Sequence, residues 1–157
     1  MDNMNSMTHY MELLATNQPW NLLIFMAVPV ILAEYIAITE LFILLRRNLS
    51  QSIKKWNRLA GIAAGIYFFG VFAYLLFTAF LPITLNNQWR GLSDLIAVSS
   101  YLLGIVPLGG IALLELGIIG KGKNEEEKLA LHVVFVAIFL VVAHVAMIFG
   151  MLDPRIL

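Results

Sequence analysis

Residues 129–152 read LALHVVFVAIFLVVAHVAMIFGML, and this stretch decides the fold. It is long enough and apolar enough for a single helix to cross the hydrocarbon core of a bilayer, which takes about 20 residues. Backbone polar groups inside lipid must be paired within the segment, so we expect a helix rather than a strand. The stretch also contains His132 and His144, which a helix separates by roughly 18 Å. Ionisable side chains at membrane depth are costly and tend to carry function, so both are candidate site residues.

Three more apolar runs of spanning length precede this one, and together the four runs set the predicted architecture. The chain has 157 residues, of which 61% are hydrophobic and 13% charged, far from the composition of soluble proteins. Short links between helices favour antiparallel neighbours. We therefore predict one domain over 1–157, an all-α integral membrane antiparallel four-helix bundle with helices at about 20–45, 59–81, 95–119 and 129–152.

Basic residues predict how the bundle is oriented. The links after the first and third runs hold most of the positive charge, at Arg46, Arg47, Lys54, Lys55, Arg58, Lys121, Lys123 and Lys128. The other exposed segments hold only Arg90 and Arg155. Because cytoplasmic loops carry the excess of Lys and Arg, we expect both basic links to be cytoplasmic and both termini to lie on the outer face.

Composition and motifs exclude several classes of function. The formal net charge is zero, so no basic field would attract nucleic acid. The chain has no cysteine, which rules out disulfides and thiolate-ligated metal sites. The N-terminal residues have neither a basic segment nor a cleavage pattern, so we do not expect a removed signal peptide. No nucleophile elbow, P-loop, HExxH or glycine-rich dinucleotide motif occurs, so we do not expect a conventional enzyme.

Three ionisable residues are predicted to lie at one depth near the cytoplasmic side, each on a different helix. Counting from the helix ends at about 1.5 Å per residue gives Glu40, Glu115 and His132 similar positions. Two carboxylates and an imidazole suit Fe, Mn or Zn, so the three residues form a candidate metal site. A carboxylate beside an imidazole is equally a proton-relay pair. Satisfied interior ion pairs are the structural alternative.

A second polar layer is predicted in the outer half of the bundle. His144, Met147 and Met151 have i, i+3, i+7 spacing and so share one face of the last helix. Thioether and imidazole groups together suit Cu(I), although methionine also fills apolar cores. Met26 on the first helix lies at a similar height, and with His144 and Met147 it makes a candidate set of haem b ligands. Two haems with paired histidine ligands are excluded by the histidine count.

Two further candidates would complete a path for cations. Glu34 lies near mid-membrane on the first helix, where it would bridge the two layers. His9 lies in an N-terminal segment with Met4, Met7 and Met11, a set of groups that would capture a metal ion.

Glycine and proline positions predict close packing and irregular helices. Gly61 and Gly65 form a pair of small residues that lets helices approach each other closely. Pro29 and Pro107 lie inside predicted helices, where each should kink the helix or free a carbonyl group.

The segments MTHYMELLATNQPWNLLIF, IVPLGGIALLELG and LHVVFVAIFLVVAHVAMIFGML resemble a family of small bacterial membrane proteins labelled as permeases or as domains of unknown function. The resemblance runs from Met7 to the C-terminus. It implies the four-helix fold. From the four apolar runs and the basic links we expect a multi-pass location in a bacterial cytoplasmic (inner) membrane.

Three hypotheses for function follow from these observations. The first is a permease-like, metal-binding membrane protein that moves a transition-metal cation (Cu, Fe or Mn) or protons along the polar path, most simply as a homo-oligomer. The second is a haem b cytochrome or a subunit of a redox complex. The third is a non-catalytic accessory subunit of a larger membrane complex, whose buried polar groups hold helices together.

Overall fold

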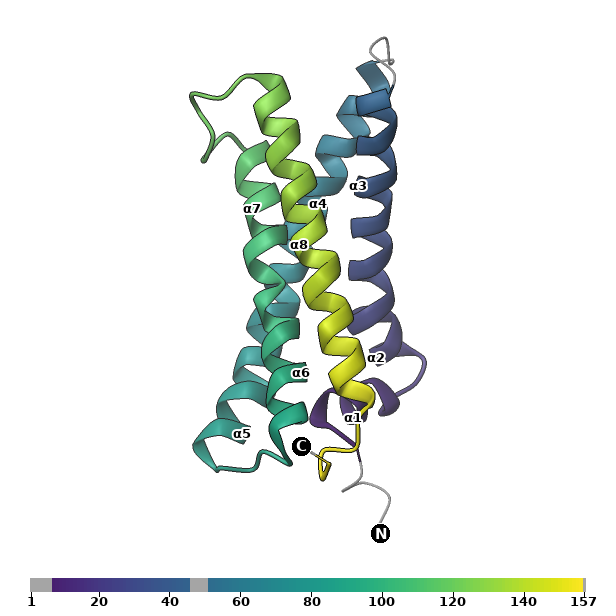
Figure 1. The fold of residues 1–157 in the computed structure, drawn as a ribbon, viewed down its shortest axis with the longest axis vertical. Helices are drawn as coiled ribbons and strands as arrows, with labels where there is room; N and C mark the ends of the chain where they lie inside the picture. The colour runs from purple at the N-terminus through teal and green to yellow at the C-terminus, as the bar shows by residue number, and fades with distance from the viewer. Residues whose placement is uncertain (1–6, 46–50, 157) are drawn as a thin grey trace.

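The computed structural model describes residues 7–45 and 51–156, and within those ranges the chain is helical and contains no strand. Four helical segments are long enough and apolar enough to cross a membrane: Trp20–Leu45, Gln51–Leu85, Leu92–Glu115 and Glu125–Met151. They lie side by side along the long axis of the molecule (Figure 1). The prediction of an all-helical chain with four helices of spanning length is confirmed.

Three of the four spans are interrupted, and one short helix precedes them. The elements in chain order are α1 (His9–Ala15), α2 (Trp20–Leu22), the π-helical η1 (Leu23–Ala27), α3 (Val28–Leu45), α4 (Gln51–Leu75), the π-helical η2 (Leu76–Phe80), α5 (Leu81–Leu85), α6 (Leu92–Leu103), α7 (Ile105–Glu115) and α8 (Glu125–Met151).

The ends of the spans differ from the predicted bounds for identifiable reasons. The second span begins at Gln51 rather than at 59, because the helix continues through polar residues that a hydropathy pattern does not register. The third span ends at Glu115 rather than at 119, and Gly117 then adopts a positive φ of 70° that leaves the helical conformation. The last helix begins earlier than predicted, at Glu125, where Asn124 and Glu127 form a capping box.

Prolines account for the interruptions. Each π-helical segment ends two residues before a proline, η1 before Pro29 and η2 before Pro82. Proline has no N–H to donate, so the carbonyl groups one turn earlier lose their helical partner. The third span breaks at Gly104, three residues before Pro107, for the same reason. The prediction that Pro29 and Pro107 disturb their helices is confirmed.

Two tyrosine hydroxyls satisfy the carbonyl groups that Pro29 leaves free. Pro29 is four residues after Phe25 and five after Ile24, so it can donate to neither carbonyl in an α- or a π-helix. The Tyr101 hydroxyl donates to the Phe25 carbonyl at 2.5 Å, and the Tyr67 hydroxyl donates to the Ile24 carbonyl at 2.9 Å. Side chains from two other spans thus supply the hydrogen bonds that the irregular first span lacks.

The middle of the bundle is an apolar layer. Its central side chains are fully buried, namely those of Ile36, Phe68, Leu108 and Ile111. Helices α4 and α7 approach closely beside it, because Gly65 lies against Ala112 and a Cβ added to Gly65 would come within 2.3 Å of the Ala112 Cβ. Gly61 lies against Ile111 in the same way, with 2.8 Å between the added Cβ and Cγ2. Both glycines therefore serve the packing role predicted for them.

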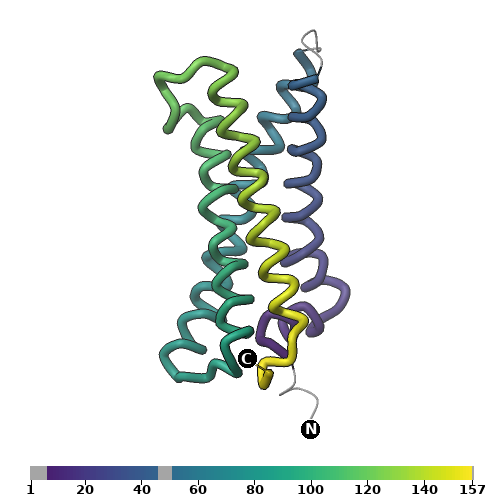
Figure 2. The backbone as a smooth tube through the Cα atoms, in the orientation of Figure 1, coloured from purple at the N-terminus to yellow at the C-terminus, as the bar shows by residue number. Residues whose placement is uncertain are grey.

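The two ends of the described chain lie together at one end of the molecule, which we call the terminus end (Figures 1 and 2). The opposite end, where α7 ends and α8 begins, we call the link end. At the terminus end, α1 folds against the bundle and buries Tyr10 and Leu14. The Tyr10 ring packs 5.3 Å from that of Tyr101, centroid to centroid.

Candidate functional site

The link end holds a buried cluster of three ionisable side chains, which we call the triad: Glu40 of α3, Glu115 of α7 and His132 of α8. His132 Nδ1 pairs with Glu40 Oε1, and both side chains are almost fully buried. His132 Nε2 lies 3.0 Å from Glu115 Oε1. The equal depth predicted for these residues thus agrees with the structure, which places one imidazole between two carboxylates.

The two imidazole nitrogens differ in how well they are satisfied. Nδ1 has a hydrogen-bonding partner in Glu40, whereas Nε2 is buried without a well-aligned hydrogen bond to any described residue. We treat the contact between Nε2 and Glu115 as an ion pair whose alignment is poor. A small displacement of the Glu115 side chain, which is 24% exposed, would align it.

Polar side chains of α4 complete the surroundings of the triad. Arg58 donates to the Glu115 carbonyl at 2.8 Å, and its Nε lies 3.5 Å from Glu115 Oε2. The Arg58 side chain is 62% exposed, so the Glu115 side of the triad faces the surface at the link end. On the other side, the buried Asn57 donates to Thr39 Oγ1 at 2.9 Å, next to Glu40 in sequence. All four spans therefore contribute polar groups to this depth.

The arrangement brings together groups that can hold and pass a proton. In residues 7–45 and 51–156, no group of three or more histidine and acidic side chains is arranged to hold a metal ion. Each nitrogen of His132 faces a carboxylate, so a proton can be held at either side of the imidazole. Coordination of a metal by the triad stays a prediction.

The residues of the predicted outer layer differ in how deeply they are buried. His144 is exposed, and its Nδ1 donates to the Leu140 carbonyl of its own helix at 2.6 Å. Met151 is also exposed, Met147 is half-buried, and Met26 packs against the core. Haem or copper binding by these residues is therefore not supported by a shared interior position, and it stays a prediction.

Glu34 also lies on the outside of the bundle. Its side chain is exposed, while its neighbour Ala33 and Ile36 on the next turn are fully buried. It therefore does not lie in the bundle interior, where a residue that bridges the two predicted layers would have to be.

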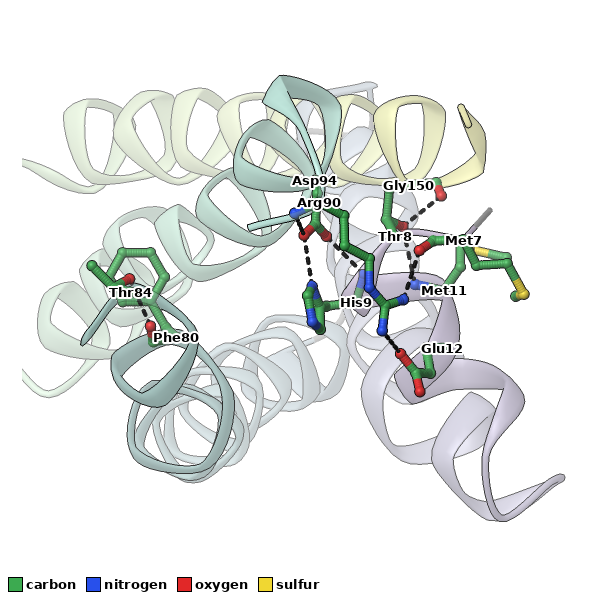
Figure 3. Close-up of polar contacts among 10 residues, drawn as sticks. All are labelled: Met7, Thr8, His9, Met11, Glu12, Phe80, Thr84, Arg90, Asp94 and Gly150. Atoms are coloured by element: carbon green, nitrogen blue, oxygen red, sulfur yellow. Dashed lines mark hydrogen bonds and ion pairs between the residues drawn. The ribbon is translucent and has the colours of Figure 1, made fainter. Parts of the chain in front are cut away.

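Thr8 and α1 fold against the terminus end, and we call this segment the cap. Figure 3 shows the polar contacts that hold it there. His9 Nδ1 lies 2.6 Å from Asp94 Oδ2, and the His9 backbone N–H donates to Asp94 Oδ1 at 2.7 Å. Arg90 donates to Glu12 at 2.5 Å and to the Met7 carbonyl at 2.7 Å. The fully buried Asp94 thus anchors α1 to the third span. Capture of a metal by His9 stays a prediction, and Met4 lies outside the described residues.

Sequence reasoning missed Glu12 and the cap as a whole, although a local signal exists. Thr8 precedes α1 and its hydroxyl accepts a hydrogen bond from the Met11 N–H, the usual role of an N-cap residue. Tyr10 and Leu14 follow at the i, i+4 spacing of a buried helix face. Tyr10 of the cap is buried, and this burial raises the pKa of its phenol to about 12.

The chain matches one protein family, described as Family of unknown function (DUF6803), over residues 4–157. The chain belongs to this family. Membership in DUF6803 agrees with the resemblance to an uncharacterised family and covers all four spans and the cap. Neither the curated proteins nor the solved structures contain a match to this chain.

Proposed function

We propose that this DUF6803 protein is a permease-like membrane protein that binds and transfers protons through the triad. One observation carries the proposal: a buried imidazole has a carboxylate at each of its nitrogens. Neutral imidazole carries one proton, so a carboxylate at each nitrogen leaves two arrangements. Either the imidazole is protonated at both nitrogens, or one carboxyl group holds a proton. Both arrangements hold a proton that can move along the cluster.

The order of transfer follows from exposure. Glu115 is the most exposed member of the triad, so it exchanges protons with the link-end surface. A proton passes from Glu115 to His132 Nε2, and the proton on Nδ1 then leaves to Glu40. The imidazole thus accepts a proton at one nitrogen and releases another at the opposite nitrogen, as histidine relays do.

The apolar layer favours a protein in which proton passage requires a rearrangement of the bundle, rather than an open proton channel. Beyond Glu40 towards the terminus end lie fully buried apolar side chains, including Ile36 and Phe68. A proton that reaches Glu40 can continue only when this layer rearranges. A change in charge at the triad favours such a rearrangement, so protons pass at a low rate even without a substrate. The same rearrangement would let a permease couple proton binding to movement of a substrate.

The orientation that goes with this proposal places the link end in the cytoplasm. Lys54, Lys55, Lys121, Lys123 and Lys128 flank the link end, and the positive-inside rule puts such residues in the cytoplasm; Arg46 and Arg47 lie outside the described residues. The bundle would then be antiparallel in a bacterial cytoplasmic membrane, with both termini and the cap on the outer face. The triad would take its protons from the cytoplasm.

Reconstitution into liposomes with an internal pH-sensitive dye tests proton transfer. A potassium gradient with valinomycin supplies the driving force, and the initial rate of internal acidification is measured. We expect His132→Phe to lower the rate roughly tenfold or more, since a positioned acid–base group contributes at least that much to proton transfer. His144→Phe is the matched control, because it makes the same chemical change at an exposed position. Equal rates for both variants and the unaltered protein would contradict the proposal.

The competing predictions have their own readout. Elemental analysis of purified protein by inductively coupled plasma mass spectrometry measures copper, iron, manganese and zinc per chain. About one metal ion per chain that disappears in Glu115→Ala would replace proton transfer with metal binding at the triad. Stoichiometric iron with a haem spectrum that is lost in His144→Ala would favour the cytochrome. Absence of both metal and proton flux would leave the accessory subunit as the leading hypothesis.

A further inference from the structure

The exposed face of α3 carries two polar groups near the middle of its span. Glu34 is exposed and Tyr35 is 42% exposed, and both lie well inside the span Trp20–Leu45. The same face continues with Ile31 and Ile38, which are 61% and 56% exposed. The polar pair is thus surrounded by apolar side chains that would face lipid in a single copy of the chain.

Neither polar group has a partner within residues 7–45 and 51–156. The structure contains no hydrogen bond or ion pair for the Glu34 carboxyl group or for the Tyr35 hydroxyl. Leaving a polar group unpaired in hydrocarbon is unfavourable, and more so for a carboxylate than for a hydroxyl. Both groups are too far from either end of the span to reach the interface, because Glu34 lies roughly 16 Å from Leu45 and farther from Trp20.

The two groups complement each other. A carboxylate accepts hydrogen bonds and a phenol donates one. Glu34 and Tyr35 are adjacent in sequence, so they differ in depth by only about 1.5 Å. A surface that carries both at one depth is self-complementary, which is the property that a two-fold interface requires.

We propose that a second copy of this chain covers the exposed face of α3. The two α3 helices pack about a two-fold axis along the membrane normal, and Tyr35 of each copy donates to Glu34 of the other. Ile31, Ile38 and Leu45 repeat every seven residues along the same face and form the apolar contact. A second copy fits better than an unrelated protein, because each unpaired group finds its complement on this same surface. The proposal is independent of proton transfer by the triad.

Disulfide cross-linking tests the interface directly, since the chain has no native cysteine. Ile38→Cys places a single thiol on the proposed interface, and Phe69→Cys places one on α4 at a similar exposure of 64%. Isolated membranes that contain either variant are oxidised with copper phenanthroline and resolved by non-reducing electrophoresis. We expect several-fold more dimer for Ile38→Cys than for Phe69→Cys. Equal yields would overturn the interface, and an adduct with a protein of a different mass would overturn the second copy as partner.

Variants of the polar pair test its role within the interface. In the Ile38→Cys background, Glu34→Leu and Tyr35→Phe each remove one side of the reciprocal contact, and both are compatible with lipid. We expect each to lower the cross-linked fraction several-fold, whereas Glu34→Gln keeps an acceptor for the phenol and should preserve most of it. An undiminished dimer in Glu34→Leu would overturn the pairing.

Discussion

At the scale of single residues, the structure shows how buried polar groups find partners inside a bundle that is mostly apolar. Tyr101 is one example, since its buried hydroxyl donates to the Phe25 carbonyl that Pro29 leaves free. A buried acceptor without a donor costs more free energy than the net gain of an ordinary hydrogen bond. Removing a single hydroxyl group of this kind should therefore lower the free energy of unfolding by a measurable amount.

Tyr101→Phe should lower the free energy of unfolding by about 1–3 kcal/mol, because it leaves the Phe25 carbonyl unpaired. Thermal unfolding in detergent, followed by circular dichroism, measures the change. Tyr74→Phe is the matched control: Tyr74 is 53% exposed, and within the described residues its hydroxyl has no hydrogen bond to lose. Equal destabilisation of the two variants would show that the hydroxyl of Tyr101 contributes nothing specific.

Docking of the cap should depend on pH through Tyr10. Burial raises the pKa of Tyr10 from the ordinary value of 10.0 to about 12 in the folded protein. Its contribution to docking is therefore complete below pH 10.0 and is lost as the pH rises to about 12. A phenolate titration at 295 nm, with the curve of Tyr10→Phe subtracted, isolates this residue among the five tyrosines. A midpoint near 10.0 would mean that α1 is not docked in solution.

At the scale of elements, the number of helices of spanning length was predictable, but the ends of these helices and the π-helical segments within them were less so. Apolar runs identified all four spans because lipid demands long unbroken apolar stretches. The start at Gln51 escaped notice, since the helix continues into polar sequence where hydropathy carries no signal. The cap was missed for a related reason, because α1 has only seven residues and is stabilised by contacts with distant residues such as Asp94.

The contact between α4 and α7 makes a prediction at this scale. Gly65→Ala should destabilise the protein by about 1–3 kcal/mol, because the added methyl group overlaps Ala112 and the Leu108 carbonyl. Gly70→Ala on the same helix is the control, since an added Cβ there meets nothing within 4 Å and alanine favours helix formation. Thermal unfolding of the two variants under identical conditions gives the comparison. If the Gly65→Ala protein were as stable as the Gly70→Ala protein, α4 and α7 could move apart without loss of stability.

At the scale of the whole molecule, polar groups gather at both ends of the bundle and an apolar layer separates them. Depth counting predicted that Glu40, Glu115 and His132 lie together, because regular helices convert sequence distance into height. Depth counting could not predict whether Glu34 and His144 lie inside the bundle or on its outside, since that depends on how each helix is rotated about its axis when it packs. Within the described residues, the polar contacts of the terminus end are organised around Asp94 and Arg90, which depth counting did not single out.

The ion pair that holds the cap should control access to the terminus end. Glu12→Gln replaces its charge-assisted contact with Arg90 by a weaker one. We expect amide hydrogen exchange in α1 to accelerate roughly tenfold, since hydrogen bonds to charged groups contribute about 1.5–3 kcal/mol. Exchange in α8 should remain unchanged. Glu125→Gln, which weakens the exposed pair with Lys128, serves as the control and should leave α1 protected.

The hydrogen bond from Thr8 to the Gly150 carbonyl joins two residues that are 142 positions apart. During synthesis, α1 leaves the ribosome first, but its acceptor is made only when the last span is nearly complete. The contacts of α1 with Asp94 and Arg90 can form once the third span is made, but the contact of Thr8 with Gly150 must wait for the fourth. The last hydrogen bond of the cap thus closes only when all four spans have been synthesised, and a chain that stalls before α8 would hold its N-terminal helix by fewer contacts.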